Sequence, residues 1–287
     1  MAQTLFRAAD SDVLKSNRAL ELRRDGFRWS VRNGVYSVTD GKQTLETPLQ
    51  WAFGFGNLGQ TWVFERNNAL YETTVSFYTS SKSIDITPGH LGLPRRNLEE
   101  AFGRIIDPSE VRRCFGCHSS GGLPEPNPGV QCEHCHKGAL GHSADLSPMA
   151  KLSKISTDEI STLCGTCHRT WEDIAVTGPH DVQNVRFQPY RLANSKCYDG
   201  ADKRISCTAC HDPHSAKQAP PKVVTTTKIN VDTQCRSCHG ATVKKVCPVG
   251  KSNCASCHMP AVEIPGIHSK FRDHWIRIAK PGAAYPD

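Results

Sequence analysis

One ten-residue stretch sets the expectations for the whole chain: Ile205-Ser-Cys-Thr-Ala-Cys-His-Asp-Pro-His214. It contains the pattern Cys-x-x-Cys-His, in which two thiols stand one helical turn apart and a histidine follows the second thiol directly. Two thiols at this spacing can add to the two vinyl groups of one porphyrin, and the histidine then lies beneath the ring as an iron ligand. The stretch therefore predicts the covalent attachment of a c-type haem.

The same pattern occurs six times in the 287 residues. We expect its thiols to hold six porphyrins and its histidines to be the proximal ligands of six irons. The motifs are Cys114–Cys117–His118, Cys132–Cys135–His136, Cys164–Cys167–His168, Cys207–Cys210–His211, Cys235–Cys238–His239 and Cys254–Cys257–His258.

Zinc is the main alternative, because Cys-x-x-Cys pairs also build four-cysteine zinc sites. Zinc does not require a histidine directly after every second cysteine. The chain has 13 His in 287 residues, so the chance of finding one at all six positions is about 10⁻⁸. A disulfide scaffold or a thioredoxin-like motif would not require these histidines either. The pattern favours six covalently attached haems.

Two of the 14 cysteines, Cys197 and Cys247, lie outside the motifs. Haem attachment of this type belongs to the oxidising side of a membrane, where a spare pair of thiols is expected to form a disulfide. The alternative is two free, buried thiols, because the sequence does not show how far apart they lie.

Seven histidines also lie outside the motifs, enough to give every iron a second histidine. His134 stands inside a motif, which limits where it can point, so it is held in reserve, as a replacement for His180. The other six are expected to be distal ligands: His90, His142, His180, His214, His268 and His274. Met149 and Met259 would be competing ligands, but Met259 directly follows His258 and Met149 is expected to be a packing residue.

Charge and hydropathy narrow the class of protein. The net charge is +7, but the basic residues are scattered, so no nucleic-acid partner is expected. No apolar stretch is long enough for a transmembrane helix. Residues 1–10 lack the apolar core of a signal peptide. Because the motifs require export, we expect a periplasmic or extracellular protein whose signal peptide is absent from this sequence.

Residues 1–107 contain no motif and are expected to form a small β-rich N-terminal unit that caps the haem region. Leucines in a polar background predict a helix over Ser11–Asp25, ended by Gly26. Two hairpins follow. The first joins Phe27–Val31 to Val35–Thr39 around Asn33-Gly34, and the second joins Thr61–Glu65 to Leu70–Tyr78.

Residues 108–287 are expected to form a mostly irregular, short-helix multihaem cytochrome c domain. A compact domain of 180 residues has a radius of gyration of about 16 Å. Six macrocycles in that volume must be neighbours in one array, and the haems themselves would supply much of the core.

Several segments resemble the multihaem cytochromes with doubled Cys-x-x-Cys-His motifs, and more broadly the tetrahaem cytochromes of nitrifying bacteria. They cover most of the chain after about residue 50: Gly59-Gln-Thr-Trp-Val63, Thr87-Pro-Gly-His90, Arg186-Phe-Gln-Pro-Tyr-Arg-Leu192, Ser195-Lys-Cys197, Ile205-Ser-Cys207 to Asp212-Pro-His214, Cys257-His-Met-Pro260 and Phe271-Arg-Asp-His-Trp275. The resemblance implies stacked haem pairs, mainly bis-His ligation, and paired cysteines at Cys197 and Cys247.

Electron transfer is the function that these features favour, because irons with two protein ligands pass electrons but bind no substrate. The redox protein partners are not specified by the sequence. One alternative is a reductase or oxidoreductase of a small nitrogen or sulfur compound at one open haem, although all six motifs end in histidine. Another is a homo-oligomer or a subunit of an extracellular conductive filament.

Overall fold

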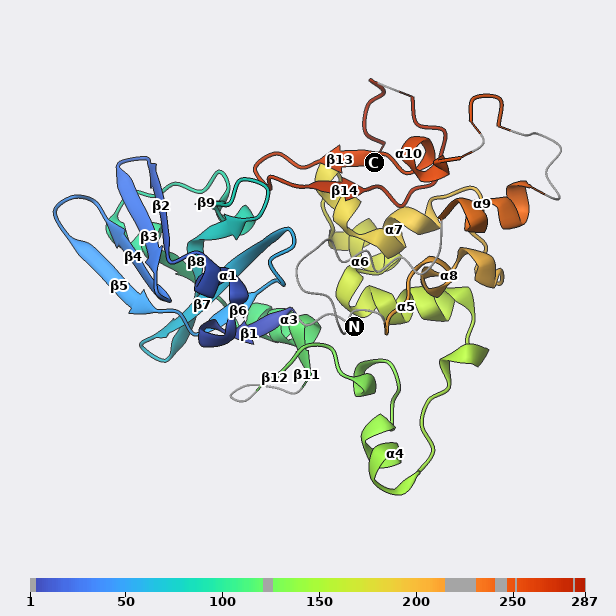
Figure 1. Cartoon of the computed structure of the whole chain (residues 1–287), viewed down its shortest axis with the longest axis horizontal. Helices are drawn as coiled ribbons and strands as arrows, with labels where there is room; N and C mark the ends of the chain where they lie inside the picture. The colour runs from blue at the N-terminus through green and yellow to red at the C-terminus, as the bar shows by residue number, and fades with distance from the viewer. Residues whose placement is uncertain are drawn as a thin grey trace. The chain divides into compact units, whose positions relative to one another are not determined.

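The computed structural model describes residues 4–120, 126–214, 231–240, 247–250, 252–280 and 282–286. Its contacts divide the chain into two compact units (Figure 1). Unit 1 holds the described residues up to Gln131 together with Pro265–Ser269, and unit 2 holds the remaining described residues. Within the described residues, no helix combines the length and the apolar character needed to cross a membrane.

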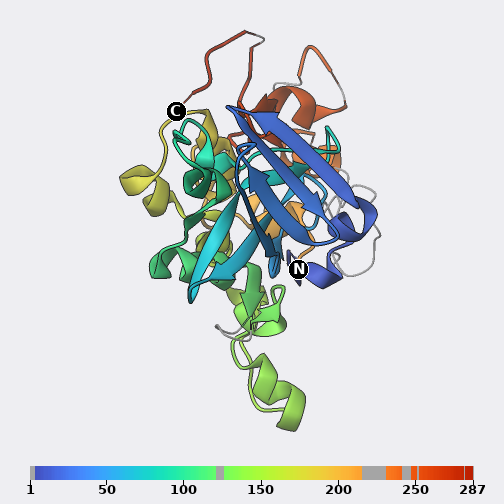
Figure 2. The ribbon, with the colours of Figure 1, turned by 90° about the vertical axis from the view of Figure 1, so that its left-hand side faces the viewer.

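Unit 1 contains a four-stranded antiparallel meander in the order β2-β3-β4-β5. Figure 2, turned so that this unit faces the reader, shows these strands in blue, side by side. Arg32 pairs with Val35 across Asn33-Gly34, where both turn residues have positive φ, so the predicted first hairpin is confirmed. The strands are β2 (Ala19–Arg24), β3 (Phe27–Arg32), β4 (Val35–Thr39) and β5 (Thr44–Pro48).

A second antiparallel sheet has the order β1-β6-β7-β8-β10, with β9 also paired to β8. The predicted second hairpin is confirmed, with Arg66 opposite Ala69 and a turn at Asn67-Asn68. The strands are β1 (Leu5–Arg7), β6 (Trp51–Phe53), β7 (Gly59–Arg66), β8 (Ala69–Tyr78), β9 (Ser83–Ile86) and β10 (Gly103–Ile105).

The core of unit 1 is formed by aromatic residues from both sheets. Trp29 and Tyr36 of the meander are fully buried with Trp62 and Phe64 of the second sheet. The Trp29 indole donates a 2.8 Å hydrogen bond to the carbonyl of Ala101, so the buried polar atom has a partner. Short helical elements accompany the sheets, among them η1 (Ala8–Asp10), η2 (Pro88–His90) and α2 (Leu98–Phe102).

The helix expected over Ser11–Asp25 is largely wrong. Only α1 (Asp12–Ser16) is helical, capped by the Ser11 hydroxyl, and the rest of the segment becomes β2. Leu20 and Leu22 alternate with exposed polar residues, which is the period of a half-buried strand. Pairing with β3 then decides the conformation.

Unit 1 extends beyond residue 107, the expected boundary, and includes the first motif. Helix α3 (Pro108–His118) begins at Asp107, whose carboxylate accepts the N–H groups of Ser109 and Glu110. Its Phe115 is buried and meets the rings of Trp51 and Phe53 edge-on, at 5.7 and 5.1 Å between centroids. A two-stranded ladder of β11 (Ser119–Ser120) and β12 (Asn127–Pro128) follows.

Unit 2 consists of short helices joined by irregular segments, as expected. In chain order its elements are η3 (Cys132–His134), α4 (Ala139–Asp145), η4 (Leu152–Lys154), α5 (Thr157–His168), α6 (Trp171–Thr177), η5 (Val182–Arg186), α7 (Gln188–Ala193), η6 (Lys203–Ile205), α8 (Cys207–Cys210), α9 (Val231–His239), α10 (Cys254–His258) and the hairpin of β13 (Ala261–Glu263) with β14 (Lys270–Arg272).

Candidate haem-binding site

Five of the six motifs lie on α-helices, and four of those helices end at the motif histidine. The fourth motif has its two thiols on α8, with His211 as the next residue, and the second motif lies at η3. Residues three apart on a helix share a face. The helical backbone therefore gives the two thiols of a motif the common direction that attachment to one ring needs.

Local signals explain why these helices begin where they do. Helix α5 starts with a capping box, in which Ser156 and Glu159 exchange side-chain and backbone hydrogen bonds. The Asp232 carboxylate on α9 accepts the N–H groups of Asn253 and Cys254, at 2.6 and 2.8 Å. The same carboxylate thereby holds the start of α10 beside α9.

Four motif histidines direct the Nδ1 atom at a protein partner. His136 donates to the Ala150 carbonyl at 3.1 Å and His258 donates to the Arg277 carbonyl at 3.0 Å. His118 meets the Thr4 hydroxyl at 2.7 Å and His168 meets the Gln188 amide oxygen at 3.1 Å. Metal-binding histidines typically use the second ring nitrogen in this way, since the bond fixes the tautomer and the ring orientation. Nε2 is then the nitrogen suited to a metal.

Successive motifs in unit 2 are close neighbours. Helices α5 and α8, which carry the third and fourth motifs, are in contact, and the neighbouring Cys207 together with burial raises the pKa of Cys164. Burial, with a smaller effect from the adjacent Cys254, raises the pKa of Cys235 to about 11. These contacts join the third motif to the fourth and the fifth motif to the sixth.

Weaker electrostatic effects connect the remaining neighbours. Burial raises the pKa of Cys135, and the nearby thiols of Cys164 and Cys167 add to this effect. Cys210 acts on Cys235 in the same sense. Helix α5 contacts α8, α8 contacts α9 and α9 contacts α10, so the third to sixth motifs follow one another in space in their sequence order.

Two pairs of histidines lie with their rings nearly parallel. His136 and His214 have ring centroids 6.2 Å apart and an interplanar angle of 16°. His211 and His274 have the same separation and an angle of 27°. Each pair joins a motif histidine to one of the expected distal ligands.

This separation fits a single metal between the two rings of a pair. A coordinating imidazole nitrogen lies about 2.0 Å from a transition metal and about 1.1 Å from its own ring centre, so two rings on opposite sides of one metal have centres about 6 Å apart. Direct ring stacking would bring the centroids closer. The residues present therefore fit bis-His haem iron at these two positions. Three or more His, Cys, Asp or Glu side chains grouped as a metal site are not found among the described residues.

The surroundings of His274 favour the neutral imidazole that binds metals. Burial, assisted by the neighbouring His211 and His168, lowers the pKa of His274 to about 4. Its Nδ1 atom donates to the Arg272 carbonyl at 3.0 Å. His142, on α4 at the end of an extended loop (Figure 1), likewise donates from Nδ1, to the Ser147 carbonyl at 2.8 Å.

Two other expected ligands are held differently, both in unit 1. His90 is buried, with Nε2 at 3.2 Å from a carboxylate oxygen of Glu72. The Nε2 atom of His268 lies 2.8 Å from a carboxylate oxygen of Asp85. In both residues the nitrogen expected to face iron faces a carboxylate. The expected ligand His180 lies between α6 and η5, and the reserve residue His134 lies at the end of η3.

The expected disulfide is not formed. Cys197 and Cys247 are both free thiols, and both are exposed rather than buried. The backbone N–H groups of Val249 and Gly250 lower the pKa of Cys247. The pair is therefore neither the disulfide nor the two buried thiols that the sequence analysis considered. The separation and the burial of two cysteines are not encoded in the local sequence.

Several residues of the site carried no signal in the sequence. Thr4 and Gln188 contact motif histidines that are 114 and 20 residues away. Arg191 and Ser195, on and directly after α7, contact the segment around His274, about eighty residues later. Their roles depend on tertiary contacts, and no spacing rule would have found them.

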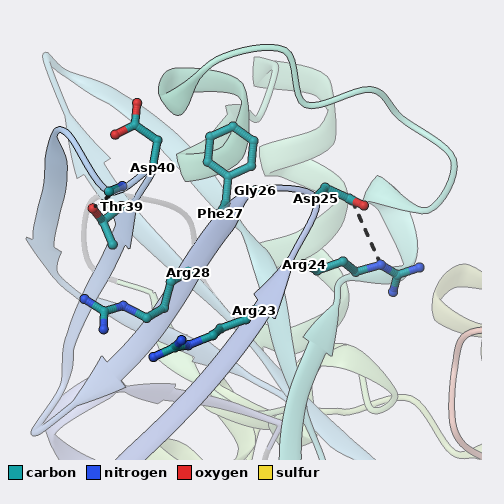
Figure 3. Close-up of a pocket in the computed structure, with 9 residues that line it drawn as sticks. Arg23, Arg24, Asp25, Gly26, Phe27, Arg28, Thr39 and Asp40 are labelled. Atoms are coloured by element: carbon teal, nitrogen blue, oxygen red, sulfur yellow. Dashed lines mark hydrogen bonds and ion pairs between the residues drawn. The ribbon is translucent and has the colours of Figure 1, made fainter.

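Unit 1 has an open pocket of about 490 Å³ at the turns of the meander. Arg23, Arg24, Arg28, Asp25 and Asp40 are among the residues that line it, and Figure 3 marks the ion pair between Arg24 and Asp25, which are 4.0 Å apart. None of the expected haem ligands lines this pocket. It is a charged surface feature of the meander.

A family model described as the doubled CXXCH motif matches residues 200–244, which contain the fourth and fifth motifs. No curated protein and no solved structure gives a significant match. The match supports a multihaem c-type cytochrome, in which the CXXCH motifs indicate covalently bound haem c.

Proposed function

We propose that this chain transfers electrons through a row of six covalently attached c-type haems, mostly or entirely with two histidine ligands each. A haem iron held by two histidines exchanges one electron without binding a substrate. The observation that carries the proposal is the placement of two histidine couples, His136 with His214 and His211 with His274. In each couple the two rings are nearly parallel and their centroids are 6.2 Å apart. Each couple could hold one haem iron between its two rings.

The chain's own residues orient the ligands and bring the haem sites together. Hydrogen bonds at Nδ1 set the ring directions of His136 and His274. The contact between α5 and α8 makes the third and fourth attachment sites adjacent. Short distances between sites favour transfer from one haem to the next, so the order of motifs along the chain is also the proposed order of the row from the third to the sixth.

The proposal extends to the setting of the protein. Attachment of haem c belongs to the oxidising side of a membrane, so we infer an exported protein, periplasmic or extracellular. Its partners would be redox proteins that donate and accept electrons. Oligomeric-state measurements would test the alternative of a homo-oligomer or filament.

Low-temperature electron paramagnetic resonance of the oxidised protein tests the proposal. We expect low-spin ferric signals from all six haems and no change when cyanide or nitrite is added. One full high-spin haem that binds either anion would instead support the reductase alternative, because it would show an open coordination position.

A further inference from the structure

Two oppositely charged side chains are completely buried beside His274. Arg191 on α7 and Asp273 directly after β14 both have no exposed side-chain surface. The guanidinium donates two hydrogen bonds to the carboxylate, from Nε at 2.9 Å and from Nη2 at 3.0 Å. Burying such a pair costs free energy unless its remaining atoms are also satisfied.

The remaining atoms do have partners. Arg191 Nη1 donates to the Pro286 carbonyl at 3.0 Å, and the guanidinium lies over the rings of Trp275 and Tyr285 at 4.9 and 4.6 Å. The Asp273 carboxylate also accepts the Trp275 N–H at 3.0 Å and an Arg277 N–H at 2.5 Å. A network satisfied to this degree holds its segment in one geometry.

Ser195, two residues after the end of α7, holds the next part of the same segment. Its hydroxyl donates to the His274 carbonyl at 3.3 Å and accepts the Ile276 N–H at 2.8 Å. On the other side, the Asp273 N–H donates to the Pro260 carbonyl at 3.0 Å. The backbone is therefore anchored on both sides of His274.

The anchored backbone fixes where the His274 ring lies. With Nδ1 bonded to the Arg272 carbonyl, the ring lies nearly parallel to that of His211, with the centroids 6.2 Å apart. His211 belongs to the fourth motif, 63 residues earlier in the sequence. No contact within either segment alone would produce this alignment.

We propose that His274 is the distal ligand of the haem attached at Cys207 and Cys210, opposite His211, and that the buried Arg191–Asp273 pair and Ser195 are its positioning residues. This inference rests on the proposed function, because it requires a haem at the fourth motif. It assigns one ligand to one haem and names the residues that hold it there.

Three variants of the full chain test the assignment. His274→Ala removes the ligand. Arg191→Met with Asp273→Leu replaces the buried ion pair by apolar side chains of similar size, which avoids leaving one buried charge alone. Arg204→Met is the matched control, because it removes an ion pair to Asp202 that is largely exposed. For each variant the haem count is measured by intact mass and the spin state by electron paramagnetic resonance.

We expect six haems in all three variants. In His274→Ala, one haem in six should become high-spin, and added imidazole should return it to low spin. The Arg191–Asp273 double variant should show a partial high-spin signal from the same haem, and Arg204→Met should match the unmodified protein. If the double variant does not fold, Ser195→Ala tests the same anchor and should also give a partial high-spin signal.

Two results would overturn the inference. A fully low-spin His274→Ala protein with six haems would show that His274 is not a ligand. A high-spin haem in His274→Ala, but none in the double variant or in Ser195→Ala, would remove the positioning role. Failure of the proposed function looks different, because the unmodified protein would then lack haem or carry an open haem before any substitution.

Discussion

At the scale of single residues, the property that matters for a histidine is which ring nitrogen its surroundings occupy. His142 and His274 donate from Nδ1 to backbone carbonyls, whereas His90 and His268 place Nε2 at carboxylates. Sequence identified all four as candidate ligands by number and turn context. It could not sort them, because Asp85, for example, lies 183 residues from His268.

His214→Ala is the sharpest substitution at this scale outside the fourth haem site. His214 lies opposite His136, so its loss should convert the haem of the second motif from low spin to high spin while the mass still shows six haems. Electron paramagnetic resonance of the oxidised variant measures this change. An unchanged low-spin spectrum would contradict the pairing of His214 with His136.

At the scale of elements, local patterns predicted the hairpins but not the whole extent of unit 1. Asn33-Gly34 needs no tertiary information to form its turn, and the structure has it as expected. The boundary of the unit depends instead on Phe115, a residue inside the first motif that packs on Trp51 and Phe53. A motif defined by its cysteines and histidine says nothing about that contact.

Phe115→Ala should therefore destabilise unit 1 without removing a haem. The side chain is 3% exposed, and truncating a buried phenylalanine costs about 3–5 kcal/mol. Chemical denaturation followed by tryptophan fluorescence measures the loss, with Leu140→Ala as the control because Leu140 is 71% exposed. Equal stability of the two variants would show that the α3 contact contributes little.

The first turn of α3 also predicts a pH dependence. A hydrogen-bonded ion pair with Arg104 lowers the pKa of Glu110 from its ordinary value of 4.5. Its folded pKa lies below the unfolded one, so the stabilisation is present above pH 4.5 and is lost as the pH falls through the folded value.

The variant Glu110→Gln isolates this contribution. It should be less stable than the unmodified protein at neutral pH, by up to about 1 kcal/mol because the pair is partly exposed. The difference should vanish at acidic pH. Thermal unfolding of both proteins across pH measures it, and a difference that does not depend on pH would contradict the assignment.

At the scale of the whole molecule, the motif count predicted six haems, and the structure shows which of the motif residues lie close together. Sequence alone indicated that six haem sites in 180 residues must be neighbours. It could not give their order or their ligand pairs, because contacts such as that of α5 with α8 and that of His211 with His274 join segments far apart in the chain. The predicted disulfide is not found for the same reason, because Cys197 and Cys247 were paired only by elimination and by a family resemblance.

The central claim is that all six motifs carry haem, and the intact mass of the folded protein tests it most directly. We expect the mass of the polypeptide plus six covalently attached haems, and the loss of one haem in the Cys207→Ala, Cys210→Ala double variant. A mass with fewer than six haems in the unmodified protein, or zinc in its metal analysis, would contradict the account.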